Sequence, residues 1–156
     1  MPRKMTVFGV GPTVFLITAA CFLAALGLHH LCPGRFAVGG VPRGVFIAAG
    51  CVLLAVGLPA LALAVKAVSR AFRKGKLATD GLYAVCRHPV YAAELACVAG
   101  VALLFQSWLM LTVPVVDYVA FRIFIRKEEE YLEQTFGQEY LDYRRRVNAL
   151  FPTLGR

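Results

Sequence analysis

The sequence predicts an all-α, polytopic membrane protein with four transmembrane helices and a C-terminal cytoplasmic amphipathic helical segment. Three observations support this fold class. Hydrophobic residues make up 59% of the 156 residues and charged residues only 17%, which is too apolar a balance for a soluble domain of this size. Two long stretches carry no charged side chain. The Lys and Arg residues concentrate in some connecting segments and are sparse in others, as they do on the two sides of a membrane.

The first two spans are the uncharged stretches Val7–Leu28 and Gly44–Val65. As helices that rise about 1.5 Å per residue, both are long enough to cross a hydrocarbon core of about 30 Å. Pro59 falls inside the second stretch, where neighbouring helices in lipid tolerate the kink that it introduces. Each stretch therefore predicts one transmembrane helix.

The next apolar stretch, Val90–Ile125, is long for one crossing and short for two. As a single helix it would measure about 54 Å, whereas two full crossings need about 40 residues. Gln106, Ser107 and Trp108 offer a polar turn with an interfacial aromatic ring. We therefore expect two slightly short helices that form a tight hairpin and thin the bilayer locally.

Charge placement supports four crossings. The loop His29–Arg43 holds only Arg35 and Arg43, whereas the segment after the second span is rich in basic residues. These are Lys66, Arg70, Arg73, Lys74, Lys76 and Arg87. A hairpin returns the chain to the same side, where the basic segment 126–146 follows. Because cytoplasmic loops carry the Lys and Arg excess, we expect both termini to be cytoplasmic.

The C-terminal segment Arg126–Leu150 has a different character from the spans. Its apolar residues recur at helical spacing on both sides of Gly137, which is the expected break between two helices. We expect this charged, amphipathic segment to form a cytoplasmic lid. The alternative is a surface helix that lies on lipid headgroups.

The net charge of +8 does not indicate a nucleic-acid partner. Basic residues that flank transmembrane helices orient the protein and attract anionic lipid, and this explains the charge more simply. The five cysteines include no CxxC pair and no spacing with His that suits a metal. We expect membrane lipids as partners, no nucleic acid and no metal site.

A polar and basic segment, TDGLYAVCRHPVY at residues 79–91, interrupts the apolar sequence. Pro89 suits the first turn of a helix, so the free amides of that turn would face the cytoplasmic interface beside Arg87 and His88. Such a helix start attracts a carboxylate or a phosphate. On spacing alone, the alternative that Arg87 and His88 only mark the membrane interface has equal weight.

A second group of charged residues surrounds the end of the expected hairpin. It consists of Asp117, Arg122, Arg126, Glu128, Glu129 and Glu130. Charged groups at membrane depth are costly unless they are paired or functional. If the hairpin closes, this group meets Arg87 and His88, and Glu94 would pair with Arg122 or line the same cavity. The alternative is a ladder of salt bridges within one helix.

Three ordered blocks between Gly75 and Pro152 carry a family resemblance. They are G-x-Y-x-x-x-R-H-P-x-Y at Gly81–Tyr91, the paired Glu128 and Glu129, and F-G-x-x-Y-x-x-Y at Phe136–Tyr143. This arrangement resembles the isoprenylcysteine carboxyl methyltransferase and phospholipid methyltransferase group of integral membrane enzymes. RHP alone is a weak signal, but three blocks in this order with a hairpin between them are specific.

The resemblance implies S-adenosylmethionine as methyl donor, bound on the cytoplasmic side. Residues 1–156 would form one domain, with two N-terminal spans in 1–66 and the cofactor-binding and catalytic half in 67–156. By position, the donor contacts would be Lys76, Leu77, Ala78, Tyr83, His88, Pro89, Val90, Tyr91 and Glu128. The family places a substrate-binding Arg one helical turn before the paired Glu, where this chain has Phe124. Arg122 and Arg126 are therefore the candidates for catalysis, together with Glu129.

Methyl transfer from a sulfonium depends mainly on in-line alignment and exclusion of water. An Arg would orient a carboxylate nucleophile, whereas an amine nucleophile would require a carboxylate such as Glu94 or Glu129 to accept its proton. A lipid-like or prenylated acceptor would enter from the bilayer, because its apolar tail is costly to move through water. We expect carboxyl O-methylation of an isoprenylcysteine-like group first, phospholipid N-methylation second and a non-catalytic membrane scaffold third.

Overall fold

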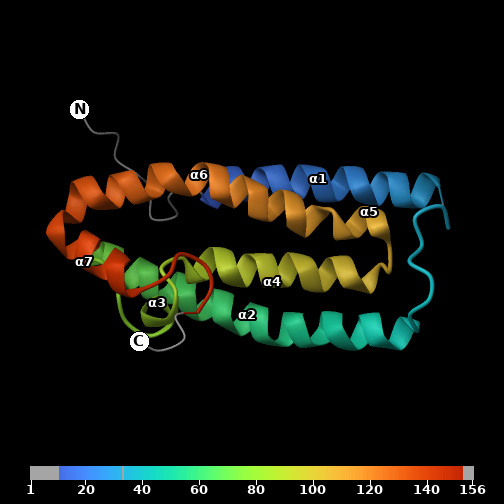
Figure 1. Ribbon diagram of the computed structural model, residues 1–156, viewed down its shortest axis with the longest axis horizontal. Coiled ribbons are helices and arrows are strands. Elements are labelled where there is room, and N and C mark those ends of the chain that lie inside the picture. Colours follow the sequence, from blue (N-terminus) through green and yellow to red (C-terminus); the bar gives the residue numbers. More distant parts are fainter. Residues whose placement is uncertain (1–10, 33, 153–156) are drawn as a thin grey trace.

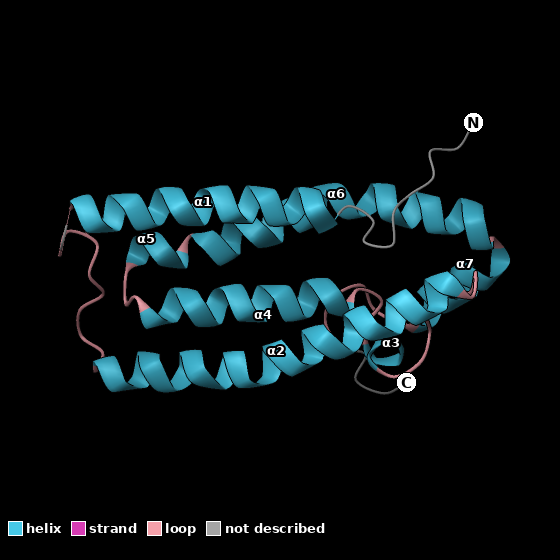
Figure 2. Cartoon of the chain, turned by 180° about the vertical axis from the view of Figure 1, so that it is seen from behind, coloured by secondary structure: helices cyan, strands magenta, loops and turns pink. Residues whose placement is uncertain are grey.

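The computed structural model describes residues 11–32 and 34–152, and every regular element within them is a helix (Figure 1; Figure 2). The helices are α1 (Gly11–Leu31), α2 (Arg43–Arg73), α3 (Leu82–Val85), α4 (Pro89–Leu104), α5 (Trp108–Leu111), α6 (Val113–Phe136) and α7 (Gln138–Arg146). The predicted all-α architecture is confirmed over this part of the chain. The start predicted for the first span, at Val7, lies outside the described residues.

The four long helices α1, α2, α4 and α6 lie along one common axis (Figure 1). Helix α1 packs along α6, helix α2 packs along α4, and α4 also contacts α6. Among the described residues, α1, α2 and the stretch Trp108–Phe136 are long and apolar enough to cross a membrane, whereas α4 is apolar but has only 16 residues. At 1.5 Å per residue α4 measures about 24 Å. The count of four spans stays a prediction.

Two helices continue beyond the ends that the hydrophobic pattern predicts. Helix α2 reaches Arg73 instead of ending at Val65, and α6 runs without a break through Arg126 to Phe136. The expectation that a separate element begins at Arg126 is therefore wrong. The run from there to Phe136 contains neither Gly nor Pro and is rich in Glu, which favours helix. The break at Gly137 is confirmed, with a φ of 54°.

The chain turns between α4 and α5 at Gln106 and Ser107, two of the residues expected to form a turn. Gln106 has a positive φ of 47°. The loop after α1 covers this turn, because the Val38 amide donates to the Gln106 carbonyl at 3.0 Å and the Trp108 amide donates to the Phe36 carbonyl at 2.8 Å. The loop between α1 and α2 is thereby hydrogen-bonded to the turn between α4 and α5 at the same end of the bundle.

Small residues allow α2 and α4 to approach closely. A Cβ atom on Gly50 would lie 2.8 Å from the Gly100 carbonyl oxygen, and a Cβ atom on Gly57 would lie 2.8 Å from Cys97 Sγ. Small residues at such contacts let helix backbones pack tightly in a membrane, where van der Waals contact drives association. This pair of helices therefore forms a fixed wall of the bundle.

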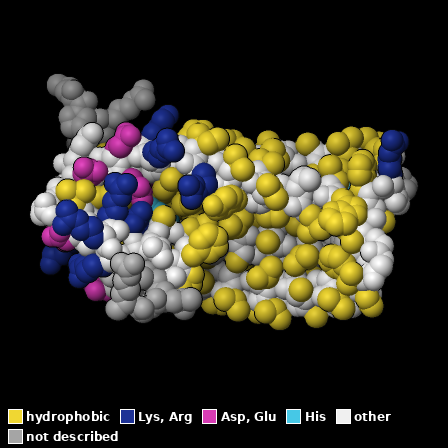
Figure 3. Space-filling view, in the orientation of Figure 1, with side chains coloured by type: hydrophobic (Ala, Val, Ile, Leu, Met, Phe, Trp, Pro, Cys, Tyr) yellow, Lys and Arg dark blue, Asp and Glu magenta, His cyan; other side chains and the backbone are white. Residues whose placement is uncertain are grey.

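Charged side chains gather at one end of the molecule, around α3 and α7, and apolar side chains cover most of the rest of the face in view (Figure 3). We call this end, formed by residues 74–88 and 126–150, the polar end. Many large apolar side chains elsewhere are exposed, among them Phe15, Leu16, Leu23, Val52, Val56, Val115 and Ile123. Such a surface suits contact with lipid tails. It agrees with the prediction of an integral membrane protein.

Candidate functional site

The motif segment places its polar residues at the start of α4. Gly81 begins the short helix α3 with a φ of 62°, a value that glycine adopts without a steric penalty. His88 then occupies the N-cap of α4, and Pro89 lies in its first turn. The predicted helix start is confirmed. Its flanking side chains Arg87 and His88 are turned into the protein, because the Arg87 side chain is only 10% exposed and His88 is only 4% exposed.

Arg87 fastens the chain that follows α7 to the start of α4. Its guanidinium donates to the carbonyl oxygens of Arg144 at 3.0 Å and Val147 at 2.7 Å. The backbone amide of Arg87 donates to Asn148 O at 2.8 Å, and the amide of His88 donates to Ala149 O at 3.0 Å. We call these contacts, together with the ion pair between Arg87 and Glu129, the Arg87 clamp.

The two paired glutamates on α6 have different partners. Glu129 accepts a hydrogen bond from Arg87 Nη2 at 2.6 Å and lies 3.3 Å from His88 Nε2, whereas Glu128 accepts a hydrogen bond from Tyr91 Oη at 2.7 Å. These contacts join α4 to the charged extension of α6 beyond its apolar part. The predicted meeting of the second charged group with Arg87 and His88 is thus observed for Glu128 and Glu129.

The environment of Glu129 lowers its pKa. Burial by itself would raise the pKa of this carboxyl, but the hydrogen bonds from His88 and Arg87 outweigh burial and lower it to about 2. Glu129 is therefore ionised at neutral pH. Its negative charge is paired with the Arg87 guanidinium inside the protein.

Helix α7 covers the motif segment through two tyrosines. Tyr143 Oη donates to the backbone carbonyl of Tyr83 at 2.6 Å, and Tyr140 has no exposed surface. Burial raises the pKa of both Tyr143 and Tyr83 above the ordinary range, so these hydroxyls stay neutral. A surface helix on lipid headgroups would not bury these side chains. The contacts favour the expected lid.

A cavity of about 1190 Å³ begins at this polar end and continues between the long helices. Nearly all residues assigned to the donor by resemblance line it. These are Lys76, Leu77, Ala78, Tyr83, His88, Val90, Tyr91 and Glu128. Pro89 is buried and does not line the cavity. Residues from the loop after α2, from α3, from the start of α4 and from α6 therefore surround one space.

The deeper part of the cavity is apolar and opens towards the outer surface. It is lined by Phe15 and Leu23 of α1 and by Leu58 of α2, whose side chains are 60%, 66% and 56% exposed. Helices α1 and α2 each pack on other helices and form opposite sides of this space. An amphiphile could therefore reach the cavity from the side, between α1 and α2.

The other expected catalytic residues lie elsewhere. Arg122 and Arg126 are exposed, and neither lines the cavity. Glu129 does not line it either, because its carboxylate is held in the Arg87 clamp. Glu94 was expected either to pair with Arg122 or to line the cavity. It lines the cavity, and Arg122 does not.

Sequence reasoning did not find the contribution of the first two helices. The lining residues of α1 and α2, such as Phe15, Phe22, Leu54 and Leu58, are apolar residues within apolar helices. Nothing in their pattern separates a cavity wall from a lipid-facing surface. A polar residue, Thr18, was the available signal, and it lines the cavity.

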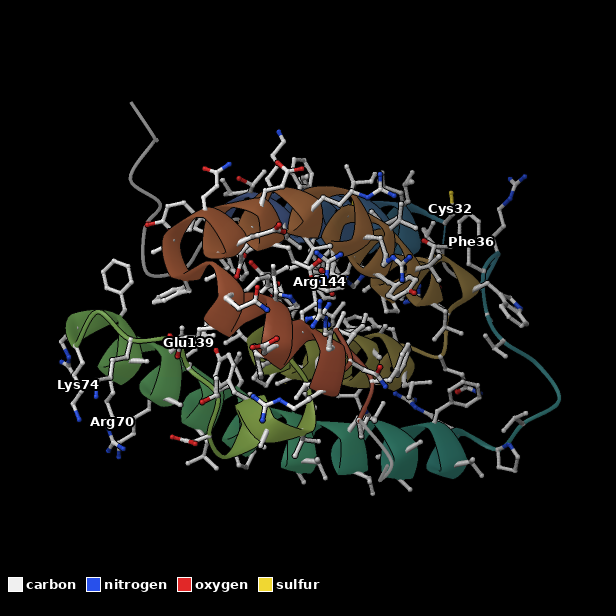
Figure 4. The ribbon with its side chains drawn as sticks, turned by 60° about the vertical axis from the view of Figure 1, so that its left-hand side comes forward. Cys32, Phe36, Arg70, Lys74, Glu139 and Arg144 are labelled. Carbon is white, nitrogen blue, oxygen red and sulfur yellow. The ribbon has the colours of Figure 1, made fainter. Side chains whose placement is uncertain are left out.

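Figure 4 shows how the two ends differ. Arg70 and Lys74 extend away from the end of α2, and Glu139 and Arg144 lie on α7 at the same end. Cys32 and Phe36 lie at the opposite end (Figure 4). Arg144 belongs to the periphery of the site, since its Nη2 lies 3.9 Å from Glu129 Oε2 and its side chain is 47% exposed.

Comparison with known proteins shows which family this chain matches. A model of the phospholipid methyltransferase family matches residues 44–139, which is more than half of the chain. The match begins in α2 and ends at the start of α7, so it includes the motif segment and the paired Glu128 and Glu129.

Three curated relatives illustrate the similarity. The cobalt-zinc-cadmium resistance protein CzcN of Cupriavidus metallidurans is 35% identical over 86 residues, 53% of this chain and 38% of that protein. Protein-S-isoprenylcysteine O-methyltransferase B of Arabidopsis thaliana is 35% identical over 78 residues, 49% and 40% of the two chains. The probable protein-S-isoprenylcysteine O-methyltransferase of Oryza sativa subsp. indica is 30% identical over 115 residues, 66% and 59% of the two chains. The matched part therefore spans less than two thirds of each relative.

Proposed function

The chain belongs to the phospholipid methyltransferase family, and on this premise we propose that it transfers a methyl group from S-adenosylmethionine to a lipid-like acceptor. One observation carries the proposal. A single cavity has the motif residues at its polar end and an apolar part that opens between α1 and α2. Such a cavity suits a reaction between a polar donor and an acceptor that arrives from the bilayer.

The residues that would hold the donor are those assigned to it by resemblance that also line the cavity, which are Lys76, Leu77, Ala78, Tyr83, His88, Val90, Tyr91 and Glu128. The chemistry of this set fits a cation, because ring faces of Tyr83 and Tyr91 attract positive charge and Glu128 balances it. When bound, S-adenosylmethionine supplies an electrophilic methyl group on a positively charged sulfur. The residues of the chain would bind the donor, orient it and exclude water.

The size of the cavity supports two ligands. Sites for drug-sized molecules measure about 300–1,000 Å³, and this cavity of about 1190 Å³ exceeds that range. The donor would occupy the polar end beneath Phe136 and Tyr140, and the acceptor tail would occupy the apolar part. Helix α7 would act as the lid, because its tyrosines close the space above the motif segment.

Two acceptor classes make opposite demands on the site. Carboxyl O-methylation of an isoprenylcysteine-like group, the first expectation, is supported by the names of the plant relatives. It would require a cation near the reacting carboxylate, and Arg122 and Arg126 do not line the cavity. N-methylation of a phospholipid headgroup is the second candidate, and it is favoured by Glu94, an acid that does line the cavity.

Donor binding tests the proposal directly. Calorimetry on the detergent-purified protein should detect S-adenosylmethionine binding, and His88→Ala and Glu128→Ala should each weaken it about tenfold or more, since each removes a polar partner worth about 1.5–3 kcal/mol. Glu130→Ala is the matched control, because Glu130 neighbours Glu128 on α6 but is exposed and does not line the cavity. Absence of binding by the parent protein would favour the membrane scaffold instead. Equal binding by all three variants would refute the donor site.

A further inference from the structure

We propose that Glu94 binds the reacting amine of the acceptor and accepts its proton, so that the cavity selects a lipid-like amine over a lipid-like carboxylate. This inference rests on the proposed function and names the substrate class of the same site.

The first observation is the isolation of the Glu94 carboxyl. Its Oε1 atom is buried and has no hydrogen-bond partner within the described structure. The neighbouring lining residues on the same face of α4 are Cys97, Val98 and Val101, and α2 contributes Leu58 and Leu61. A carboxyl group in apolar surroundings is costly unless it is paired. A ligand in the cavity can supply that partner.

Among the described residues, no basic side chain lines the cavity at this depth. The cavity-lining basic residues, Lys76, Arg87 and His88, precede α4 at the polar end. Of these, Arg87 is already held by Glu129 and two carbonyl groups. The other buried acid nearby, Asp117, accepts a hydrogen bond from Thr18 at 2.6 Å and does not line the large cavity. The charge of the deeper cavity is therefore acidic, which suits a cationic headgroup and opposes a carboxylate.

The second observation is the position of Glu94 between the two parts of the cavity. It lies three residues after Tyr91 on α4, hence about one helical turn deeper, on the same face. Tyr91 contacts Glu128 at the polar end, and the lining residues that follow Glu94 on α4 carry no charge. An amphiphile whose tail fills the apolar part would place its headgroup beside Glu94.

The proton transfer balances as follows. The ammonium group of the acceptor gives one proton to the Glu94 carboxylate and becomes a neutral amine. The nitrogen lone pair then forms the bond to the donor methyl carbon, while the carbon–sulfur bond breaks and its electron pair stays on sulfur. The products are a methylated ammonium and a neutral thioether, and Glu94 later releases the proton to solvent. A carboxylate acceptor would need no such base.

A binding experiment without the donor tests the selectivity. The purified protein in phosphatidylcholine nanodiscs is titrated with octylamine and with octanoate, which share chain length, and binding to empty nanodiscs is subtracted. We expect octylamine to bind about tenfold more tightly or better, and Glu94→Gln to abolish this preference. Asp117→Asn is the matched control, a buried acid outside the large cavity, and should keep the preference. A parent protein without the preference, or a Glu94→Gln variant that retains it, would overturn the proposal.

A kinetic experiment tests the proton transfer. Nanodiscs that contain phosphatidylethanolamine, or a soluble S-farnesylcysteine derivative with a free carboxylate, are incubated with methyl-labelled donor. We expect base-stable label in the amine lipid, a loss of kcat of about a hundredfold in Glu94→Gln and partial rescue in Glu94→Asp. The Kd of the donor should not change. Formation of the base-labile ester alone would overturn this inference and leave the proposed function standing, whereas absence of donor binding would overturn both.

Discussion

The Arg87 clamp provides a sharp test of how the site is held together. Arg87→Ala removes the ion pair with Glu129, whose two side chains are 10% and 13% exposed, and two hydrogen bonds to carbonyl groups near the end of α7. Removing one partner of a buried pair costs about 3–5 kcal/mol. Because both side chains keep some solvent contact, we expect about 3 kcal/mol, equivalent to a roughly hundredfold change in an equilibrium constant.

Hydrogen exchange measures this change where it occurs. The amides of Arg87 and His88 donate to Asn148 and Ala149, so they are protected while the clamp is closed. Arg87→Ala should raise the exchange rate of the His88 amide up to about a hundredfold, because exchange follows the free energy of local opening.

Arg145→Ala is the control for this experiment. It removes an arginine side chain from α7, but this side chain is 76% exposed, and its ion pair with Asp142 at 3.5 Å is exposed as well. Exposed pairs of this kind contribute little. If the two variants exchange at the same rate in peptides that contain His88, the clamp does not hold the chain and the reasoning is refuted.

Three further predictions concern packing, the lid and pH. Gly57→Ala should lower the free energy of unfolding by about 1–3 kcal/mol in thermal unfolding, since its Cβ would meet Cys97 Sγ at 2.8 Å. Adding Cys97→Ala to this variant should restore most of the lost stability. The control Gly27→Ala should be neutral, because its Cβ would meet nothing within 4 Å. Tyr143→Phe should cost about 1–2 kcal/mol and weaken donor binding measured by calorimetry, because the carbonyl of Tyr83 loses its buried donor; unchanged values would contradict the lid contact. The pKa of Glu129 lies below its ordinary value of 4.5, so its contribution to stability should be complete above about pH 4.5 and be lost as the pH falls towards 2. Denaturation scans should show this loss in the parent and not in Glu129→Gln.

The motif blocks predicted the polar end of the site well. Spacing placed Pro89 at a helix start and brought Glu128 towards His88, and both features are observed. The same reasoning did not identify Arg87 as the residue that fastens the C-terminal segment. Its partners there are backbone carbonyl groups, and a carbonyl group is present at every position of any sequence.

The candidate catalytic arginines show a second limit. Arg122 and Arg126 share a helix face with each other, but the direction of that face depends on how α6 rotates against α1 and α4. The structure turns Glu128 and Glu129 inward and leaves both arginines exposed. A helical repeat in the sequence gives relative angles around one helix, whereas the inward direction is set by packing between helices.

The sequence by itself indicated a membrane environment, an all-helical fold and the order of the motif blocks. These features follow from the length of the hydrophobic stretches, the placement of charge and local helix signals. Only the tertiary structure decided that α1 and α2 stand on opposite sides of one cavity and that Glu94 lines it, with its Oε1 atom unpaired among the described residues. The physical reason is that a cavity is a property of what several helices leave unfilled between them. No single helix carries that information in its own pattern.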